Sequence, residues 1–255
     1  SGDVTIKNNV IYSTELGNDI YGLDIYYSDN LDFINNKVYG VYYSAYVYES
    51  EILTFQNNEF YESLLGLYIE NSIFNMTGDH IYDNTGGIEI IDASDTVYMN
   101  DVTLTREKGD SDYGLRVSGS NIVAENSLLD AAPNGGEETE TYDIELSQSN
   151  LTLYNTTINK TSIVSYDTES LVKGYWYAKV RATNLAGNGI SGASVSAVSD
   201  AMDYSTTTGS SGYTGWILVP TYLIEFGIEE SEDSKIPGDR LMGATKTETK
   251  LLKKN

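Results

Sequence analysis

Three charged residues, Glu89, Arg116 and Glu145, occupy the same place in three segments of similar sequence. An arginine flanked by two carboxylates can take part in proton transfer if the fold brings the three side chains together. The same residues can instead form opposite-charge pairs between neighbouring strands. We favour structural pairing, and we predict no catalytic residue in this chain.

The remaining residue types narrow the possible chemistry. Cysteine is absent and His80 is the only histidine, which excludes thiolate chemistry and metal sites with two histidines. His80 is expected to face solvent, where a lone histidine more often has no role. Two acidic clusters in expected loops are weak candidates for binding calcium through oxygen ligands: Asp110, Asp112, Glu137 and Glu138. We therefore predict no cofactor, with calcium as the one candidate.

The charge balance restricts the partners. The 255 residues include 38 acidic and 15 basic ones, for a formal net charge of −23. Nucleic acids and anionic membranes bind basic patches, so both are excluded as expected partners. No apolar run approaches the length of a membrane span. Such acidity is typical of a solvated surface, of cation binding or of salty surroundings.

Asparagine sequons provide a further kind of candidate site. Asn75, Asn150 and Asn159 each begin an Asn-x-Ser/Thr motif and are predicted to carry glycans on a surface protein. Asn75 lies between two inward apolar residues and should therefore face solvent. A fourth sequon, at Asn155, is expected at a corner and is less accessible.

These residues lie within a repeated sequence pattern. Segments such as VTIKNNVI (4–11), LDFINNKV (31–38) and LTFQNNEF (53–60) alternate apolar residues and then carry a polar pair. The second members of the pairs recur 21–27 residues apart and are predicted to form a corner ladder of stacked side chains: Asn9, Asn36, Asn58, Asp79, Asn100 and Asn126.

A second repeated segment lies between the first ones, as in GLDIYYS (22–28) and GLYIENS (66–72). It predicts two inward apolar columns and a closing serine column. The first inward column is Leu23, Ala45, Leu67, Ile88, Leu115 and Ile144. The second is Ile25, Val47, Ile69, Ile90, Val117 and Leu146. The serine column is Ser28, Ser50, Ser72, Ala93, Ser120 and Ser149.

Short strands that recur about every 22 residues indicate a solenoid in which each turn stacks on the next. The sequence thus predicts an all-β protein with a parallel β-helix of about six to seven turns over residues 1–172. The tyrosine-rich stretch 35–50 is its second turn, with Tyr46 facing outward beside Asp24 and Tyr68.

The motif G-[LI]-x-[IV]-x-x-S followed by N-x-[IVF]-x-x-N-x-[IVF] resembles the repeat of pectate-lyase-like proteins over residues 4–170. It most resembles the versions found in copper-binding maturation proteins of nitrous oxide reduction and in archaeal surface proteins. This resemblance implies a right-handed β-helix and an archaeal cell-surface origin. In lyases of this type, calcium-binding carboxylates act with an Arg or Lys base.

A different pattern follows the repeats. Residues 176–199 and 208–226 form alternating runs joined at glycines, which predicts a small antiparallel β-sandwich over 173–229. Gly189, Gly192 and Gly212 resemble the pattern of carboxypeptidase-regulatory-like or immunoglobulin-like modules. Residues 230–255 are predicted to be a tail that frays, adds an edge strand or donates a strand to another subunit.

The first turn begins close to Ser1, so we expect an open end on which a second copy can stack. The resulting hypothesis is a non-catalytic extracellular structural protein that self-associates, head to tail or laterally, into a surface layer, sheath or filament. The alternative is a carbohydrate-active β-helix enzyme, or a polysaccharide-binding or adhesion module with glycans as partners.

Overall fold

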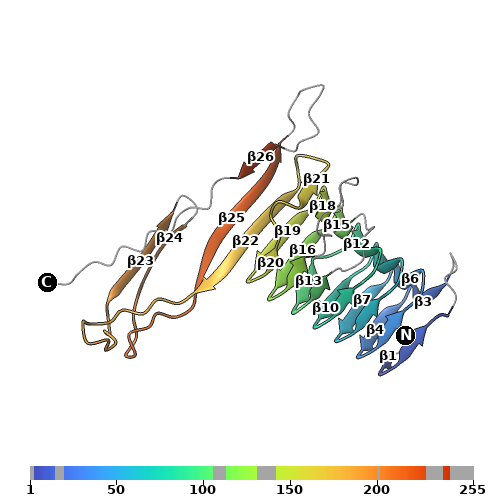
Figure 1. Cartoon of the computed structure of the whole chain (residues 1–255), viewed down its shortest axis with the longest axis horizontal. Helices are drawn as coiled ribbons and strands as arrows, with labels where there is room; N and C mark the ends of the chain where they lie inside the picture. Colours follow the sequence, from blue (N-terminus) through green and yellow to red (C-terminus); the bar gives the residue numbers. More distant parts are fainter. Residues whose placement is uncertain are drawn as a thin grey trace.

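A computed structural model describes residues 3–14, 20–105, 113–130, 142–199, 202–227 and 238–241. Every regular element among these residues is a β-strand, as predicted. Figure 1 shows the strands of the first 165 residues stacked as successive turns of one coil, with longer antiparallel strands at the far end from the N-terminus.

Three parallel sheets form the walls of the coil. The first wall, sheet A, contains β1 (Val4–Lys7), β4 (Asp29–Ile34), β7 (Glu51–Gln56), β10 (Phe74–Thr77), β13 (Val97–Asn100), β16 (Asn121–Glu125), β19 (Asn150–Tyr154) and β22 (Leu171–Ala178). The second wall, sheet B, contains β2 (Val10–Tyr12), β5 (Lys37–Tyr39), β8 (Glu59–Tyr61), β11 (His80–Tyr82), β14 (Thr103–Thr105), β17 (Leu128–Asp130) and β20 (Thr157–Ile158). The third wall, sheet C, contains β3 (Tyr21–Tyr26), β6 (Tyr43–Tyr48), β9 (Leu65–Glu70), β12 (Gly86–Ile91), β15 (Tyr113–Ser118), β18 (Tyr142–Ser147) and β21 (Ile163–Ser165).

The core fills the interior of the coil with one apolar side chain per column and turn. The register of sheet C pairs Leu23 with Ala45 and Ile25 with Val47, and it continues so up the wall, which confirms both predicted columns. Phe33, Phe55 and Phe60 pack edge to face or stacked in the same interior. Burial of each such side chain contributes roughly 1.5–3 kcal/mol.

The corner between sheets A and B carries the asparagine ladder. The backbone N–H groups of Asn9, Asn36 and Asn58 each donate to the side-chain Oδ1 one turn ahead, at 2.8–2.9 Å, and the last acceptor is Asp79. The residue before each rung has a left-handed backbone, which asparagine tolerates well; in the first three turns it is Asn8, Asn35 and Asn57.

The predicted ladder is wrong at Asn100 and Asn126. Asn100 is the last residue of β13 and pairs with Thr77, while Asn126 is a left-handed corner residue that accepts from Asn155 Nδ2. The rungs of these turns are instead Val102 and Ser127, and Val102 N donates to Ser127 Oγ. Sheet register decides which residue follows the corner. The polar type of a residue does not, so the predicted rungs lie one or two positions before the observed ones.

The corner between sheets C and A carries the predicted serine ladder. The N–H groups of Ser28, Ser50 and Ser120 donate to the serine hydroxyl one turn ahead, at 3.0–3.1 Å. Ala93 interrupts the ladder because it has no hydroxyl, although its N–H donates to Ser120 Oγ. These hydrogen bonds satisfy the backbone N–H groups at the corner, which have no partner within the sheets.

The C-terminal strands are antiparallel and begin within the coil. β22 pairs in parallel with β19 and also pairs antiparallel with β25 (Ile217–Gly227), so it runs across the expected boundary at residue 172. β26 (Gly238–Leu241) lies on the edge of β25, inside the predicted tail. The second antiparallel pair is β23 (Ser194–Ser199) with β24 (Met202–Thr207).

β25 adds its own side chains to the core of the coil. Tyr222, Ile224 and Phe226 are buried in the same apolar cluster as the interior columns. A Cβ atom at Gly174 would lie 2.3 Å from the Tyr222 ring, so only glycine allows this approach. The antiparallel strands are thus joined to the last turns by packing as well as by β22.

Candidate functional site

The predicted charged triplet lies on the outer face of sheet C. Glu89, Arg116 and Glu145 come from β12, β15 and β18 and are neighbours in register. Arg116 Nε lies 2.8 Å from Glu145 Oε2, and its Nη1 lies 3.5 Å from Glu89 Oε1. The side chain of Glu145 is only 5% exposed. The residues therefore form the cross-strand pairing that we favoured.

Tyr113 completes this cluster. Its hydroxyl donates to Glu89 Oε2 at 2.7 Å, and the Arg116 guanidinium carbon lies 3.7 Å from the centre of its ring. Burial and the hydrogen bond to Glu89 raise the pKa of Tyr113 well above its usual range. Burial lowers the pKa of Arg116, but the hydrogen bond to Glu145 and the nearby negative charges outweigh it and raise that pKa. Each carboxylate thus forms an ion pair with Arg116, and Glu89 also accepts from the Tyr113 hydroxyl.

The tyrosines of sheet C stack on one another from turn to turn. The rings of Tyr46 and Tyr68 lie 4.9 Å apart and are nearly parallel, and Tyr21 stacks on Tyr43 at 5.5 Å. A sugar ring binds an aromatic side chain through the flat face of the ring. In these stacks the ring faces lie against each other, so they present mainly edges and hydroxyl groups outward.

Sheet B carries a second aromatic stack, which consists of Tyr12, Tyr39, Tyr61 and Tyr82, with ring centres 4.8–5.3 Å apart. His80 lies on the same outer face, as predicted, and its ring centre is 4.3 Å from that of Tyr82. Burial lowers the pKa of His80, which keeps the imidazole neutral at physiological pH. His80 therefore acts as a packing partner of the stack.

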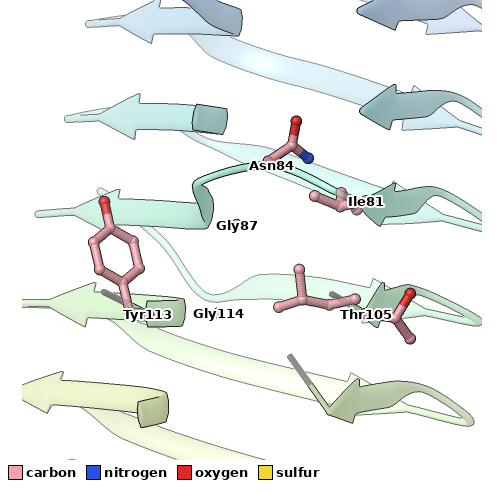
Figure 2. Close-up of a pocket in the computed structure, with 7 residues that line it drawn as sticks. Ile81, Asn84, Gly87, Thr105, Tyr113 and Gly114 are labelled. Carbon is pink, nitrogen blue, oxygen red and sulfur yellow. The ribbon is translucent and has the colours of Figure 1, made fainter. Parts of the chain in front are cut away.

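A small void lies where sheets B and C meet, lined in part by Leu104 of β14 and Tyr113 of β15. Figure 2 shows Asn84, Ile81 and Tyr113 around it, together with Gly87 and Gly114. It has room for about one water molecule. Asn84 accepts from Ser63 N at 3.0 Å and donates to Phe60 O at 2.9 Å, so its amide belongs to a third corner ladder rather than to a ligand site.

The other predicted sites have different outcomes. Asn75, Asn150 and Asn159 are exposed, so their sequons are accessible, and glycosylation stays a prediction. The calcium candidates Asp110, Asp112, Glu137 and Glu138 lie outside the described residues. Within the described ranges, no three His, Asp or Glu side chains group closely enough to hold a metal ion, and no helix could cross a membrane.

One surface feature was missed at the sequence level. The end of β22, the start of β25 and the chain segments just beyond them carry six exposed side chains: Tyr177, Lys179, Arg181, Tyr213, Trp216 and Leu218. We call these six residues the aromatic–cationic strip. The alternation in WYAKVR (176–181) could have indicated one half of this strip. The other half comes from a segment more than 30 positions further along the chain.

The comparisons with known proteins address the fold. The family model described as "Right handed beta helix region" matches residues 21–202. A search of curated proteins finds no match to the sequence. A crystal structure of the pectate lyase Pel9A is similar with a TM-score of 0.40 and 13% identity, over 55% of this chain and 43% of that chain.

Proposed function

Because the chain belongs to the right-handed β-helix family, we propose that it is a non-catalytic structural protein of an extracellular layer, sheath or filament. The observation that carries this proposal is that the charged and aromatic side chains on the outer face of sheet C are paired or stacked with each other. Arg116 pairs with both Glu89 and Glu145, and the tyrosine rings stack face to face. Such contacts stiffen a rod, whereas an acid–base pair must be open to substrate.

An extracellular location is supported by the three exposed sequons, Asn75, Asn150 and Asn159. The chain alone has a mass of 28.1 kDa. We expect protein from its native source to be heavier by the mass of attached glycans at one or more of these positions. Intact-mass analysis before and after deglycosylation measures this difference, and a bare chain would remove the support.

The structural role is tested by assembly. We expect the purified protein to associate reversibly as its concentration rises, because a structural subunit must contact its own copies. Light scattering and negative-stain microscopy at increasing concentration measure this. A protein that stays strictly monomeric at high concentration would sink the proposal.

The enzymatic alternative needs its own assay. We expect no depolymerisation of acidic polysaccharides with or without calcium. Any activity found would be compared between the wild type, Arg116→Ala and Arg116→Lys. Activity that is lost in both variants while the fold is retained would replace the structural proposal with an enzymatic one.

A further inference from the structure

The aromatic–cationic strip lies on two antiparallel chain segments, just beyond the last register pair of β22 and β25, Ala178 with Ile217. Arg181 forms a β-bridge with Tyr213. The Lys179 ammonium lies 5.1 Å from the Tyr213 ring centre and 5.3 Å from that of Trp216. Trp216 is 68% exposed. The strip therefore holds two cations beside large, exposed aromatic side chains.

The two cations of the strip are not neutralised by nearby acids. Neither Lys179 nor Arg181 forms an ion pair with a described residue. Both contact aromatic rings, and the Arg181 guanidinium carbon is 5.1 Å from the centre of Tyr213; Arg181 Nη2 also donates to Gly187 O at 3.5 Å. A cation on an aromatic ring keeps its charge, so the strip attracts an anionic partner.

The chain itself provides an acidic surface of opposite character. Residues 20–105 contain fourteen acidic residues and a single lysine, whereas residues 171–227 contain three acidic and three basic residues. Exposed carboxylates gather within two residues of the serine ladder in the first four turns: Asp29, Glu49, Glu51, Asp92 and Asp95. We call these residues the acidic corner.

The distance between neighbouring charges is similar on the strip and on the acidic corner. Lys179 and Arg181 are two residues apart just after the end of β22, and if this segment is extended they are separated by about 7 Å. Asp29 and Glu51 are neighbours in register on adjacent turns, about 5 Å apart. None of the acidic-corner side chains forms an ion pair with a described lysine or arginine. Among the described residues, both surfaces thus carry charges without an oppositely charged partner, and the charges of the two surfaces are opposite.

We propose that the aromatic–cationic strip of one copy docks on the acidic corner of a second copy. The inference rests on the proposed structural function and names the surfaces that would form the contact. The two surfaces differ, so each copy uses one of each. A contact of this heterologous kind propagates into an open polymer unless its rotation closes a ring.

The net charge of −23 opposes association at long range. At physiological ionic strength charges are screened over about 8 Å, so short-range pairs at the contact outweigh the overall repulsion. The aromatic side chains of the strip, Tyr213 and Trp216, are exposed and add apolar area that docking would remove from water, as in other interfaces. The attraction is thus local, and charge reversal at either surface should abolish it.

The experiment uses two charge-reversed forms of the full chain. The strip variant carries Lys179→Glu and Arg181→Glu, and the corner variant carries Glu49→Lys and Glu51→Lys. Sedimentation velocity measures association of each variant alone and of an equimolar mixture. We expect each variant alone to associate at least tenfold more weakly than the wild type. We expect the mixture to recover association, because both of its contacts are again between opposite charges.

A matched control is Lys173→Glu, since Lys173 is an exposed lysine of the same strand, β22, outside the strip. It should associate like the wild type. Thermal unfolding of every variant checks that the fold is retained, and Trp216→Ala tests the strip without changing charge. We expect Trp216→Ala to weaken association severalfold.

The outcomes separate the inference from the proposed function. Assembly of the wild type that both reversed variants retain would overturn the docking inference and leave the structural role standing. Failure of the mixture to recover association would overturn it as well. A wild type that does not associate at all would sink the structural role. A monomeric wild type whose Trp216 fluorescence reports saturable binding of polygalacturonate would assign the strip to an acidic glycan instead.

Discussion

At the scale of single residues, two buried acidic side chains are stabilised in different ways. Glu145 is neutralised by Arg116, whereas Asp79 is held in the corner ladder by N–H donors alone. Burial raises the pKa of Asp79 to about 7, although the hydrogen bonds from Asn58 and Thr77 lower it. The two preceding rungs of the ladder, Asn36 and Asn58, fill the equivalent place without a charge.

The Asp79 carboxyl should make stability depend on pH. In the unfolded chain it loses its proton near pH 4, but in the folded chain only near pH 7. The folded state binds more protons between these values and is therefore destabilised as pH rises through them. We expect Asp79→Asn to gain up to about 4 kcal/mol over the wild type between pH 4 and pH 8. Urea unfolding at both pH values measures this gain.

The converse substitution is the control for Asp79. Asn58→Asp puts a second buried carboxyl beside the first and removes the amide that donates to Asp79 Oδ1 at 2.8 Å. It should destabilise the protein more at pH 8 than at pH 4. If the free energies of unfolding of Asp79→Asn and the wild type changed in parallel with pH, the Asp79 carboxyl would not cause the pH dependence.

Removal of Arg116 should leave Glu145 buried without a counterion. We expect Arg116→Ala to lower the free energy of unfolding by about 3 kcal/mol at pH 8. Denaturant unfolding at this pH measures the loss. Lys37→Ala is the control, because the Lys37–Glu59 pair is exposed, at 50% and 36%, and should contribute little.

At the scale of elements, polar side chains at the corners hydrogen-bond each turn of the coil to the next. Ser50, Ser72 and Ser120 each accept an N–H from the preceding turn and donate back to their own strand end, as Ser72 Oγ does to Glu70 O at 2.7 Å. Each rung therefore links a turn to its neighbour and closes its own corner. The ladder is continuous except at Ala93 and defines the angle between sheets C and A.

Filling the missing rung should stabilise the coil. Ala93→Ser places a hydroxyl where Ser72 N can donate to it, as Ser50 N donates to Ser72 Oγ at 3.0 Å. We expect a gain of about 1 kcal/mol, the net value of one such hydrogen bond. The midpoint of urea unfolding measures the gain. Ser72→Ala is the matched control and should lose at least as much; a destabilised Ala93→Ser would contradict the ladder account.

At the scale of the whole molecule, acidic charge is concentrated on one part. The turns of residues 20–105 carry fourteen acidic residues against a single lysine, and the antiparallel strands are nearly balanced. Asp29 and Glu51 even lie next to each other in register. Like charges in such proximity destabilise a folded protein, and dissolved ions reduce that repulsion.

Salt should therefore stabilise the fold. We expect the thermal midpoint to rise by several degrees as NaCl is raised from about 0.01 M to about 0.5 M, over which the screening length shortens several-fold. Differential scanning calorimetry measures the midpoint. Calcium and magnesium chlorides at equal ionic strength should act alike. A midpoint raised by micromolar calcium alone would instead indicate a specific site, with Asp110, Asp112, Glu137 and Glu138 as the first candidates.

The coil and its inner columns could be predicted from the sequence. Parallel turns place equivalent residues directly above one another, so the fold repeats itself in the chain as periodic apolar and serine positions. The outward triplet Glu89, Arg116 and Glu145 followed from the same periodicity. The prediction was wrong at Asn100 and Asn126, because polar side chains near a corner are interchangeable in type and only hydrogen-bonded register shows which one forms the rung.

Tertiary structure alone decided the remaining features. The ring faces of Tyr46 and Tyr68 are covered by each other because the turns lie about 5 Å apart, a spacing that matches aromatic stacking. β22 leaves the coil as an antiparallel strand because β25 pairs with it and buries Tyr222 in the core. That pairing also brings Lys179 to 5.3 Å from the Trp216 ring across 37 positions of sequence, where no local pattern could predict it.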